Sequence, residues 1–217
     1  APDGVTGIAA TVLFELNRLE LATALLEYVK DRDPLSPVAH YNLGYAHYLS
    51  GRWKEAIALL KETLRLSPDL GAAHNLMGSA LLLQGRAADA LDAFDRKPLD
   101  VSRQAGLVMV AHDQQKMEAY RTRLQEFIQR WGDEAPSSVA MIHAHAGEAD
   151  NAYRWLDRAI EQEQEGLGTL LRDPLFSPIH EDPRWQKTLA RIGRAPEQLA
   201  RISFDVTHPA NTDVADG

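Results

Sequence analysis

The first half of the chain repeats itself at an interval of 34 residues. Small residues, turn residues and a second set of small residues recur in register. The aligned columns are Ala10, Gly44 and Gly78; Asn17, Gly51 and Gly85; and Ala22, Ala56 and Ala90. A period of this length is typical of stacked supersecondary units, because one such unit cannot bury its apolar face alone. We therefore expect an array of similar units.

Each unit is predicted to be a pair of antiparallel helices. Small residues at Gly44 and Ala56 allow the two helices to approach closely, and Gly51-Arg52 makes the tight turn between them. Ser67-Pro68-Asp69 ends the second helix, because proline cannot continue a helix. The sequence thus predicts an all-α fold without a sheet.

Two units carry the repeated pattern most clearly. Its residues are Leu43, Gly44, Gly51, Ala56, Leu60 and Pro68 in one unit, and Met77, Gly78, Gly85, Ala90 and Phe94 in the next. The pattern resembles the tetratricopeptide repeat. The first unit is less similar, because Ala9 and Ala10 replace a large apolar residue and a glycine. This resemblance implies a right-handed superhelical solenoid that binds a protein or peptide partner and is not an enzyme.

Five hairpins with a capping helix are predicted in all. The hairpins span residues 3–34, 37–68, 71–98, 100–131 and 136–162. Beyond them, Asp173-Pro174 and Asp182-Pro183 each begin a short helix, since Asp suits the N-cap and Pro the first helical position. The second helix, near 182–193, would cover the open apolar end of the solenoid. Residues 1–202 are expected to form the solenoid, and 203–217 an extended or disordered tail through which copies of the chain could associate.

The end of the chain carries a second resemblance. Asp173-Pro174-Leu175-Phe176 and Asp182-Pro183-Arg184-Trp185 resemble the end of tetratricopeptide regions in bacterial signalling proteins. There the repeats follow an adenylate or guanylate cyclase domain or a winged-helix DNA-binding domain. The similarity covers roughly residues 38–193 and implies a cytoplasmic regulatory role.

Two other interpretations stay open. One is a periplasmic or envelope assembly adaptor, whose mature N-terminus would be Ala1-Pro2. The other is a non-catalytic fragment of an enzyme. The chain as given shows no signal peptide, because it has no charged segment followed by an apolar one.

Charge and composition argue against several kinds of partner. The 217 residues include 23 Lys and Arg against 31 Asp and Glu, a net charge of −8. General nucleic-acid binding is therefore not expected, because it needs a basic surface. No apolar run approaches the roughly 20 residues that span a bilayer. The chain has no cysteine, so disulfides, thiolate nucleophiles and cysteine-ligated zinc are excluded.

The sequence contains no recognised catalytic, cofactor-binding or metal-binding motif. His143 and His145 are two residues apart and face different sides of a helix, whereas metal pairs on helices prefer a spacing of four. His40 and His47 share the packing seam of one unit, which favours a structural role. A basic stripe consists of Arg184, Lys187, Arg191 and Arg194. It is either a site for an anionic partner or the solvated face of the capping helix.

The resemblance places the concave, partner-binding face on the first helix of each unit. The predicted contact residues are Thr11, Phe14, Tyr41, Asn42, Tyr45, Tyr48, Asn75, Ser79 and Leu82. The three tyrosines are spaced four and three apart, so they share one helix face, and tyrosine is frequent at binding hot spots. The alternative is that these rings pack against neighbouring helices. Some relatives clamp a peptide carboxylate with Lys, Arg and Asn on these positions. Here no cation is present, so an apolar or hydrogen-bonding segment is expected.

Overall fold

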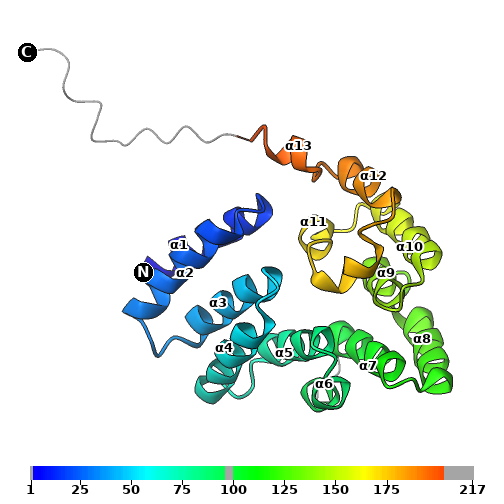
Figure 1. Cartoon of the computed structure of the whole chain (residues 1–217), viewed down its shortest axis with the longest axis horizontal. Coiled ribbons are helices and arrows are strands. Elements are labelled where there is room, and N and C mark those ends of the chain that lie inside the picture. The colour runs from blue at the N-terminus through cyan, green and yellow to red at the C-terminus, as the bar shows by residue number, and fades with distance from the viewer. Residues whose placement is uncertain (1, 96–99, 203–217) are drawn as a thin grey trace, which may run out of the picture.

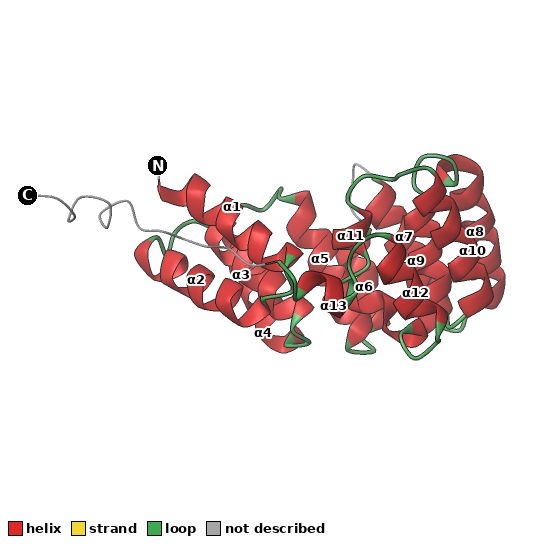
Figure 2. Cartoon of the chain, turned by 90° about the horizontal axis from the view of Figure 1, so that it is seen from above, coloured by secondary structure: helices red, strands yellow, loops and turns green. Residues whose placement is uncertain are grey.

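The computed structural model describes residues 2–95 and 100–202, which contain helices and no strand (Figure 2). The predicted all-α fold is confirmed. The five hairpins are α1 (Pro2–Glu15) with α2 (Leu19–Arg32), α3 (Pro37–Leu49) with α4 (Trp53–Leu66), α5 (Gly71–Leu83) with α6 (Ala87–Phe94), α7 (Val101–Asp113) with α8 (Met117–Trp131), and α9 (Pro136–His145) with α10 (Ala149–Glu161). Consecutive helices pack against one another throughout this series (Figure 1).

The hairpin bounds follow the predicted ones closely. The main difference lies in the third hairpin, where α6 ends at Phe94 and residues 96–99 lie outside the described part of the chain. The predicted tail, residues 203–217, also lies outside it. The first helices of successive hairpins touch from α3 onward, so that α3, α5, α7 and α9 form the inner layer of the solenoid (Figure 1).

The turn column of the repeat is explained by backbone conformation. Gly51, Gly85 and Gly147 have φ near +72°, and Asn17 and Gln115 hold the same place at +56° and +58°. The next residue donates its N–H back into the helix, as Arg52 does to the carbonyl of His47 at 2.9 Å. This is the Schellman arrangement, which ends a helix at a left-handed residue.

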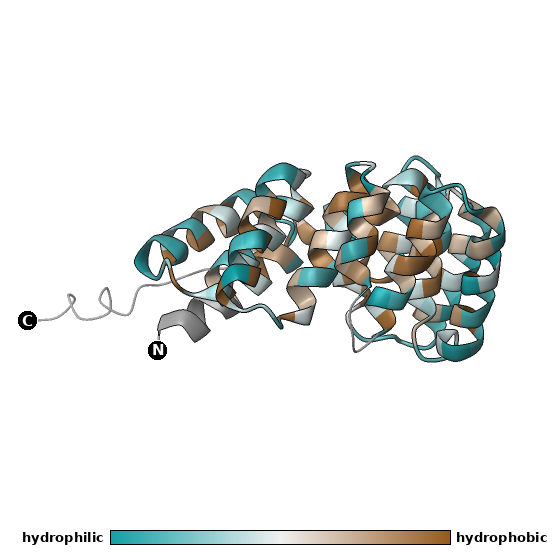
Figure 3. Ribbon diagram, turned by 90° about the horizontal axis from the view of Figure 1, so that it is seen from below, coloured by the Kyte–Doolittle hydropathy of each residue, from teal (hydrophilic) through white to brown (hydrophobic). Residues whose placement is uncertain are grey.

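The small residues of the repeat lie where helices touch. Ala22, Ala56, Ala90 and Ala152 are all 0% exposed. Apolar and hydrophilic positions alternate along the helices, as expected where only one face is buried (Figure 3). One core cluster joins α1, α2 and α3, and a larger one runs from α3 to α12.

Between the fifth hairpin and residue 202, where the described part of the chain ends, there are four short elements. They are α11 (Leu167–Leu170), the 3-10 helix η1 (Pro174–Ile179), α12 (Arg184–Arg191) and α13 (Pro196–Leu199). Asp173 accepts a hydrogen bond from the N–H of Leu175, and Asp182 accepts one from the N–H of Arg184, both at 2.9 Å, as expected for helix starts. The helix expected near 182–193 is α12.

The segment between α10 and α12 turns back into the curve of the solenoid. η1 packs against α9 and contacts α5, and α11 contacts α1 at the other end of the chain (Figure 1). Part of the inner layer is therefore covered by the chain itself.

Candidate functional site

The predicted contact residues divide into two groups by exposure. Tyr48, Leu82 and Phe14 are buried, with exposed fractions of 0%, 3% and 7%. Tyr41, Asn42, Tyr45, Asn75 and Ser79 are half-buried, and Thr11 is exposed. The first group contributes to the core, so only the second offers surface to a partner.

The tyrosine stripe forms part of an aromatic cluster. The Tyr45 ring packs edge-on against Phe14 of α1, with centroids 5.2 Å apart, and stacks on Tyr48 at 6.5 Å. Burial raises the pKa of the Tyr41 and Tyr45 hydroxyls, so both are neutral donors at physiological pH. The stacked rings of Tyr45 and Tyr48 lie on one helix face. The contact between Tyr45 and Phe14 shows that this ring also packs against a neighbouring helix, which was the alternative role.

Tyr48 is bonded to the returning segment. Its hydroxyl donates to Asp173 Oδ1 at 2.5 Å. Burial raises the pKa of the Asp173 carboxyl, while the hydrogen bonds from Tyr48 and from the N–H of Leu175 act in the opposite direction. Because Tyr48 is fully buried against its own chain, it is not available to a partner in this conformation.

The amide of Asn75 has partners on the next hairpin. Its Nδ2 donates to Asp100 Oδ2 at 3.3 Å, and its Oδ1 accepts from Arg103 Nε at 3.1 Å. Arg103 is 4% exposed. These contacts fasten α5 to α7, which gives Asn75 a structural role in addition to its place on the inner layer.

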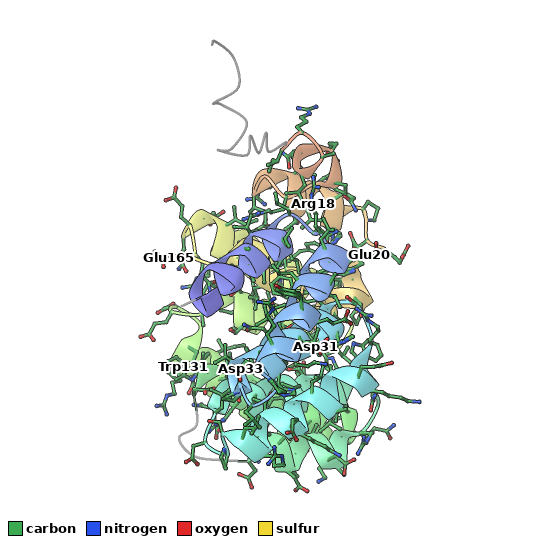
Figure 4. The ribbon with its side chains drawn as sticks, turned by 90° about the vertical axis from the view of Figure 1, so that its left-hand side faces the viewer. Arg18, Glu20, Asp31, Asp33, Trp131 and Glu165 are labelled. Carbon is green, nitrogen blue, oxygen red and sulfur yellow. The ribbon has the colours of Figure 1, made fainter. Side chains whose placement is uncertain are left out.

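A cavity of about 470 Å³ lies where the first hairpin meets the C-terminal segment. Apolar walls come from Leu49, Trp185 and Leu199, while Arg18, Arg172 and Arg194 supply three cationic side chains. Figure 4 shows Arg18 at the end of the α1–α2 hairpin, beside the C-terminal helices. Leu49, which lines the pocket, lies on α3 four residues after Tyr45, and Tyr45 interacts electrostatically with Arg172.

Positive charge exceeds negative charge at this pocket. Arg194 forms an ion pair with Glu15 at 2.5 Å, and both Arg172 and Arg194 donate to the Glu15 backbone carbonyl. Burial lowers the pKa of the Arg172 guanidinium and nearby Arg194 lowers it further, whereas Glu15 raises it. Arg172 Nη1 is buried without a hydrogen-bond partner among the described residues. An anionic group of a ligand in the pocket would reduce the repulsion between Arg172 and Arg194.

The lone histidines have structural explanations. His40 Nε2 lies 2.9 Å from the carbonyl oxygen of Pro34, and His74 Nε2 lies 3.0 Å from that of Pro68. Each buried ring thus links a first helix to the turn before it. His143 and His145 face different acids, Glu148 and Asp113, in agreement with their predicted separation.

The basic stripe is largely neutralised within the chain. Arg184 forms ion pairs with Asp182 at 2.7 Å and Asp150 at 2.9 Å, and it lies over the Tyr153 ring at 4.3 Å. Arg191 pairs with Asp157. These contacts hold α12 against α10, which agrees with the interpretation as the outer face of a capping helix.

Comparison with known proteins finds two segments of the chain that match a repeat family. Residues 9–70 and residues 49–105 each match the tetratricopeptide repeat family. Together, the two matched segments run from α1 into α7. Among curated proteins, none matches the chain. Among solved structures, the chain is similar to YrrB, described as a tetratricopeptide protein with an unusual peptide-binding site. That match has 19% identity and a TM-score of 0.49, and covers 74% of this chain and 86% of YrrB.

The helical solenoid has a pocket that the repeat pattern did not predict. Three of its residues, Arg172, Trp185 and Arg194, lie outside the repeats. The 34-residue pattern could therefore not indicate that they lie beside the first hairpin.

Within the described residues, the helices are too short or too polar to span a membrane.

Proposed function

We propose that the chain is a non-catalytic scaffold that binds a protein or peptide partner at the pocket between the first hairpin and the C-terminal segment. The pocket carries the proposal, because it combines leucine and tryptophan walls with three arginines and one nearby acid. Such a site favours an apolar segment that bears a carboxylate. The half-buried residues Tyr41, Asn42, Tyr45, Asn75 and Ser79, with exposed Thr11, would extend the contact along the inner layer.

This proposal revises the expected ligand chemistry. The repeat positions themselves offer no cation, which spoke against recognition of a carboxylate. The arginines come instead from the turn before α2 and from the C-terminal segment. A peptide with an acidic side chain or a free C-terminus next to an apolar residue would therefore suit the pocket better than a purely apolar one.

A randomised peptide library with free C-termini tests the proposal. Enriched peptides are measured by fluorescence anisotropy against the parent chain and against Arg18→Ser and Arg172→Gln. A hydrogen bond to a charged group contributes about 1.5–3 kcal/mol, so each variant is expected to bind roughly tenfold more weakly or worse. The matched control is Arg65→Gln, whose arginine is exposed and, among the described residues, forms an ion pair with Glu62 on α4 alone.

Two results would contradict peptide binding at this pocket. In one, the library yields no enriched peptide. In the other, the enriched peptides bind Arg18→Ser and Arg172→Gln as tightly as they bind the parent chain. Amidation of the peptide C-terminus separates the two sources of negative charge, because it weakens binding only if the terminal carboxylate is the recognised group.

Tyr45 is the half-buried residue of the predicted stripe that lies one helical turn before Leu49, which lines the pocket. Tyr45→Ala is expected to weaken peptide binding by roughly 30-fold, since a hot-spot ring contributes ~2 kcal/mol or more. Because Tyr45 also packs on Phe14, the matched control is Tyr45→Phe, which keeps the ring and removes only the hydroxyl. Equal affinity of Tyr45→Ala and the parent, with unchanged circular dichroism, would exclude the stripe.

The biological setting of this scaffold is part of the same proposal. The similarity of residues 38–193 to signalling proteins supports a cytoplasmic regulatory part of a bacterial regulator, without general nucleic-acid binding. An envelope adaptor and a non-catalytic fragment of an enzyme are the alternatives, and self-association through residues 203–217 would be compatible with each. The gene sequence upstream separates them: a cyclase or winged-helix domain supports the regulator, and a signal peptide supports the adaptor.

A further inference from the structure

Two histidines and an aspartate converge between the fourth and fifth hairpins. His112 and Asp113 lie at the end of α7, and His145 lies at the end of α9, which packs against α7. One ligand atom from each of the three lies within 4.8 Å of the other two. Their side chains are 30%, 20% and 11% exposed, so the cluster is partly desolvated but open to solvent on one side.

The spacing of these atoms suits a metal ion. Asp113 Oδ1 lies 3.2 Å from His112 Nδ1 and 2.9 Å from His145 Nε2. Two ligands of a tetrahedral zinc ion with bonds of ~2.1 Å are separated by about 3.4 Å. The three groups therefore need shifts of only a few tenths of an ångström on these two edges to surround an ion.

The surroundings hold the ligands in place. The His112 ring packs edge-on against Tyr120, with centroids 5.2 Å apart, and the Tyr120 hydroxyl donates to Glu148 at 3.2 Å. The two histidine rings lie 6.1 Å apart at 73°.

We propose that His112, Asp113 and His145 bind a divalent transition-metal ion of the Zn²⁺ type, with solvent completing its coordination. Imidazole nitrogen with one carboxylate oxygen is a ligand set that suits zinc and its neighbours rather than Mg²⁺ or Ca²⁺. The ion would link α7 to α9 and so fasten the fourth hairpin to the fifth. This site is distinct from the peptide pocket, and the proposal does not depend on the proposed function.

The neighbouring pair of His143 and Glu148 provides a matched control. His143 lies on α9 two residues before His145, and its Nδ1 lies 2.6 Å from Glu148 Oε2. It is also a histidine–carboxylate pair. Within the described part of the chain, however, no second histidine joins this pair to make a three-residue cluster. A role that rests only on pairing a histidine with an acid would be shared by both sites.

Isothermal titration of the metal-free full chain with ZnCl₂ near pH 7.5 tests the site. We expect one ion per chain with micromolar or tighter affinity, and a higher melting temperature with zinc. His145→Gln, His112→Gln and Asp113→Asn are expected to weaken binding by ~10-fold or more, since even supporting residues of metal sites cost 10- to 100-fold. His143→Gln is expected to bind as the parent does.

X-ray absorption at the zinc edge gives an independent measurement on the parent chain. Two imidazole ligands with one or more oxygen ligands would support the proposal. Absence of binding at 100 μM zinc, equal affinity in His145→Gln, or a spectrum with fewer than two imidazoles would overturn it.

Discussion

Gly44 and Gly78 occupy the same column of the repeat but differ in the space around them. A Cβ at Gly78 would lie 2.5–2.7 Å from three ring atoms of Phe94, whereas a Cβ at Gly44 would come no closer than 3.3 Å to Leu60 Cγ. The Phe94 ring cannot retreat, because it is 1% exposed and a Cβ at Gly106 would meet it at 2.5 Å from the next hairpin. The same substitution should therefore have opposite effects at the two positions.

The balance between helix propensity and overpacking decides whether each substitution raises or lowers the free energy of unfolding. Replacing glycine by alanine inside a helix contributes about 1 kcal/mol of helix propensity at either position. Overpacking costs typically 1–3 kcal/mol and applies in full only at Gly78. We expect Gly44→Ala to leave stability unchanged or raise it by up to ~1 kcal/mol. The free energy of unfolding of Gly78→Ala should be about 1–3 kcal/mol lower than that of Gly44→Ala.

Urea unfolding followed by circular dichroism measures the difference between the two variants. Phe94→Leu, combined with Gly78→Ala, should recover part of the loss, because the smaller side chain leaves room for the methyl group. A double-mutant cycle then isolates the coupling between the two positions. Equal stability of Gly44→Ala and Gly78→Ala would refute the packing argument at Phe94.

Three further substitutions test the rest of the fold. Ala152→Leu should lower stability by about 1–3 kcal/mol, because Ala152 is 0% exposed where α9 and α10 touch; an unchanged melting temperature would contradict this packing. Tyr48→Phe should cost about 1.5–3 kcal/mol, because buried Asp173 loses a donor; urea unfolding measures it. Burial raises the native pKa of Asp173, so its contribution is most favourable at acid pH and declines as pH rises from the unfolded value of about 3.9 through the native pKa. Asp173→Asn should remove that decline, and a stability profile from pH 3 to 8 parallel to the parent's would contradict it.

The repeat architecture was predictable because its signals are local. Each hairpin needs a residue that adopts the left-handed conformation at its turn and a small buried residue where its two helices touch. These residues therefore recur once per repeat. Even Gln115, which lacks the usual glycine, takes the turn conformation at φ +58° because the helices on both sides require it. In the third hairpin α6 ends at Phe94, and the last predicted residues of that hairpin, 96–99, lie outside the described part of the chain.

The candidate site was predictable only in part, because it depends on contacts between distant parts of the chain. The helix register predicted a shared face for Tyr41, Tyr45 and Tyr48, and the rings of Tyr45 and Tyr48 stack on one another. What lies over that face is a segment 125 residues further along, which brings Asp173 to Tyr48. Such a contact cannot be predicted from the periodic pattern of the sequence.

The position of the returning segment determines where a partner can enter. η1 covers the inner layer at α5 and α9, and Asp173 seals Tyr48, so that end of the face is closed. At the other end, Leu49 of α3 still lines the pocket together with Arg18 and Arg172. We expect a ligand that leaves the C-terminal segment in place to enter through this pocket, past Arg18. Substitutions at this entrance should change binding more than substitutions of Ser79 or Leu82 on α5, and a greater effect at α5 would mean that the segment leaves the inner layer when a partner binds.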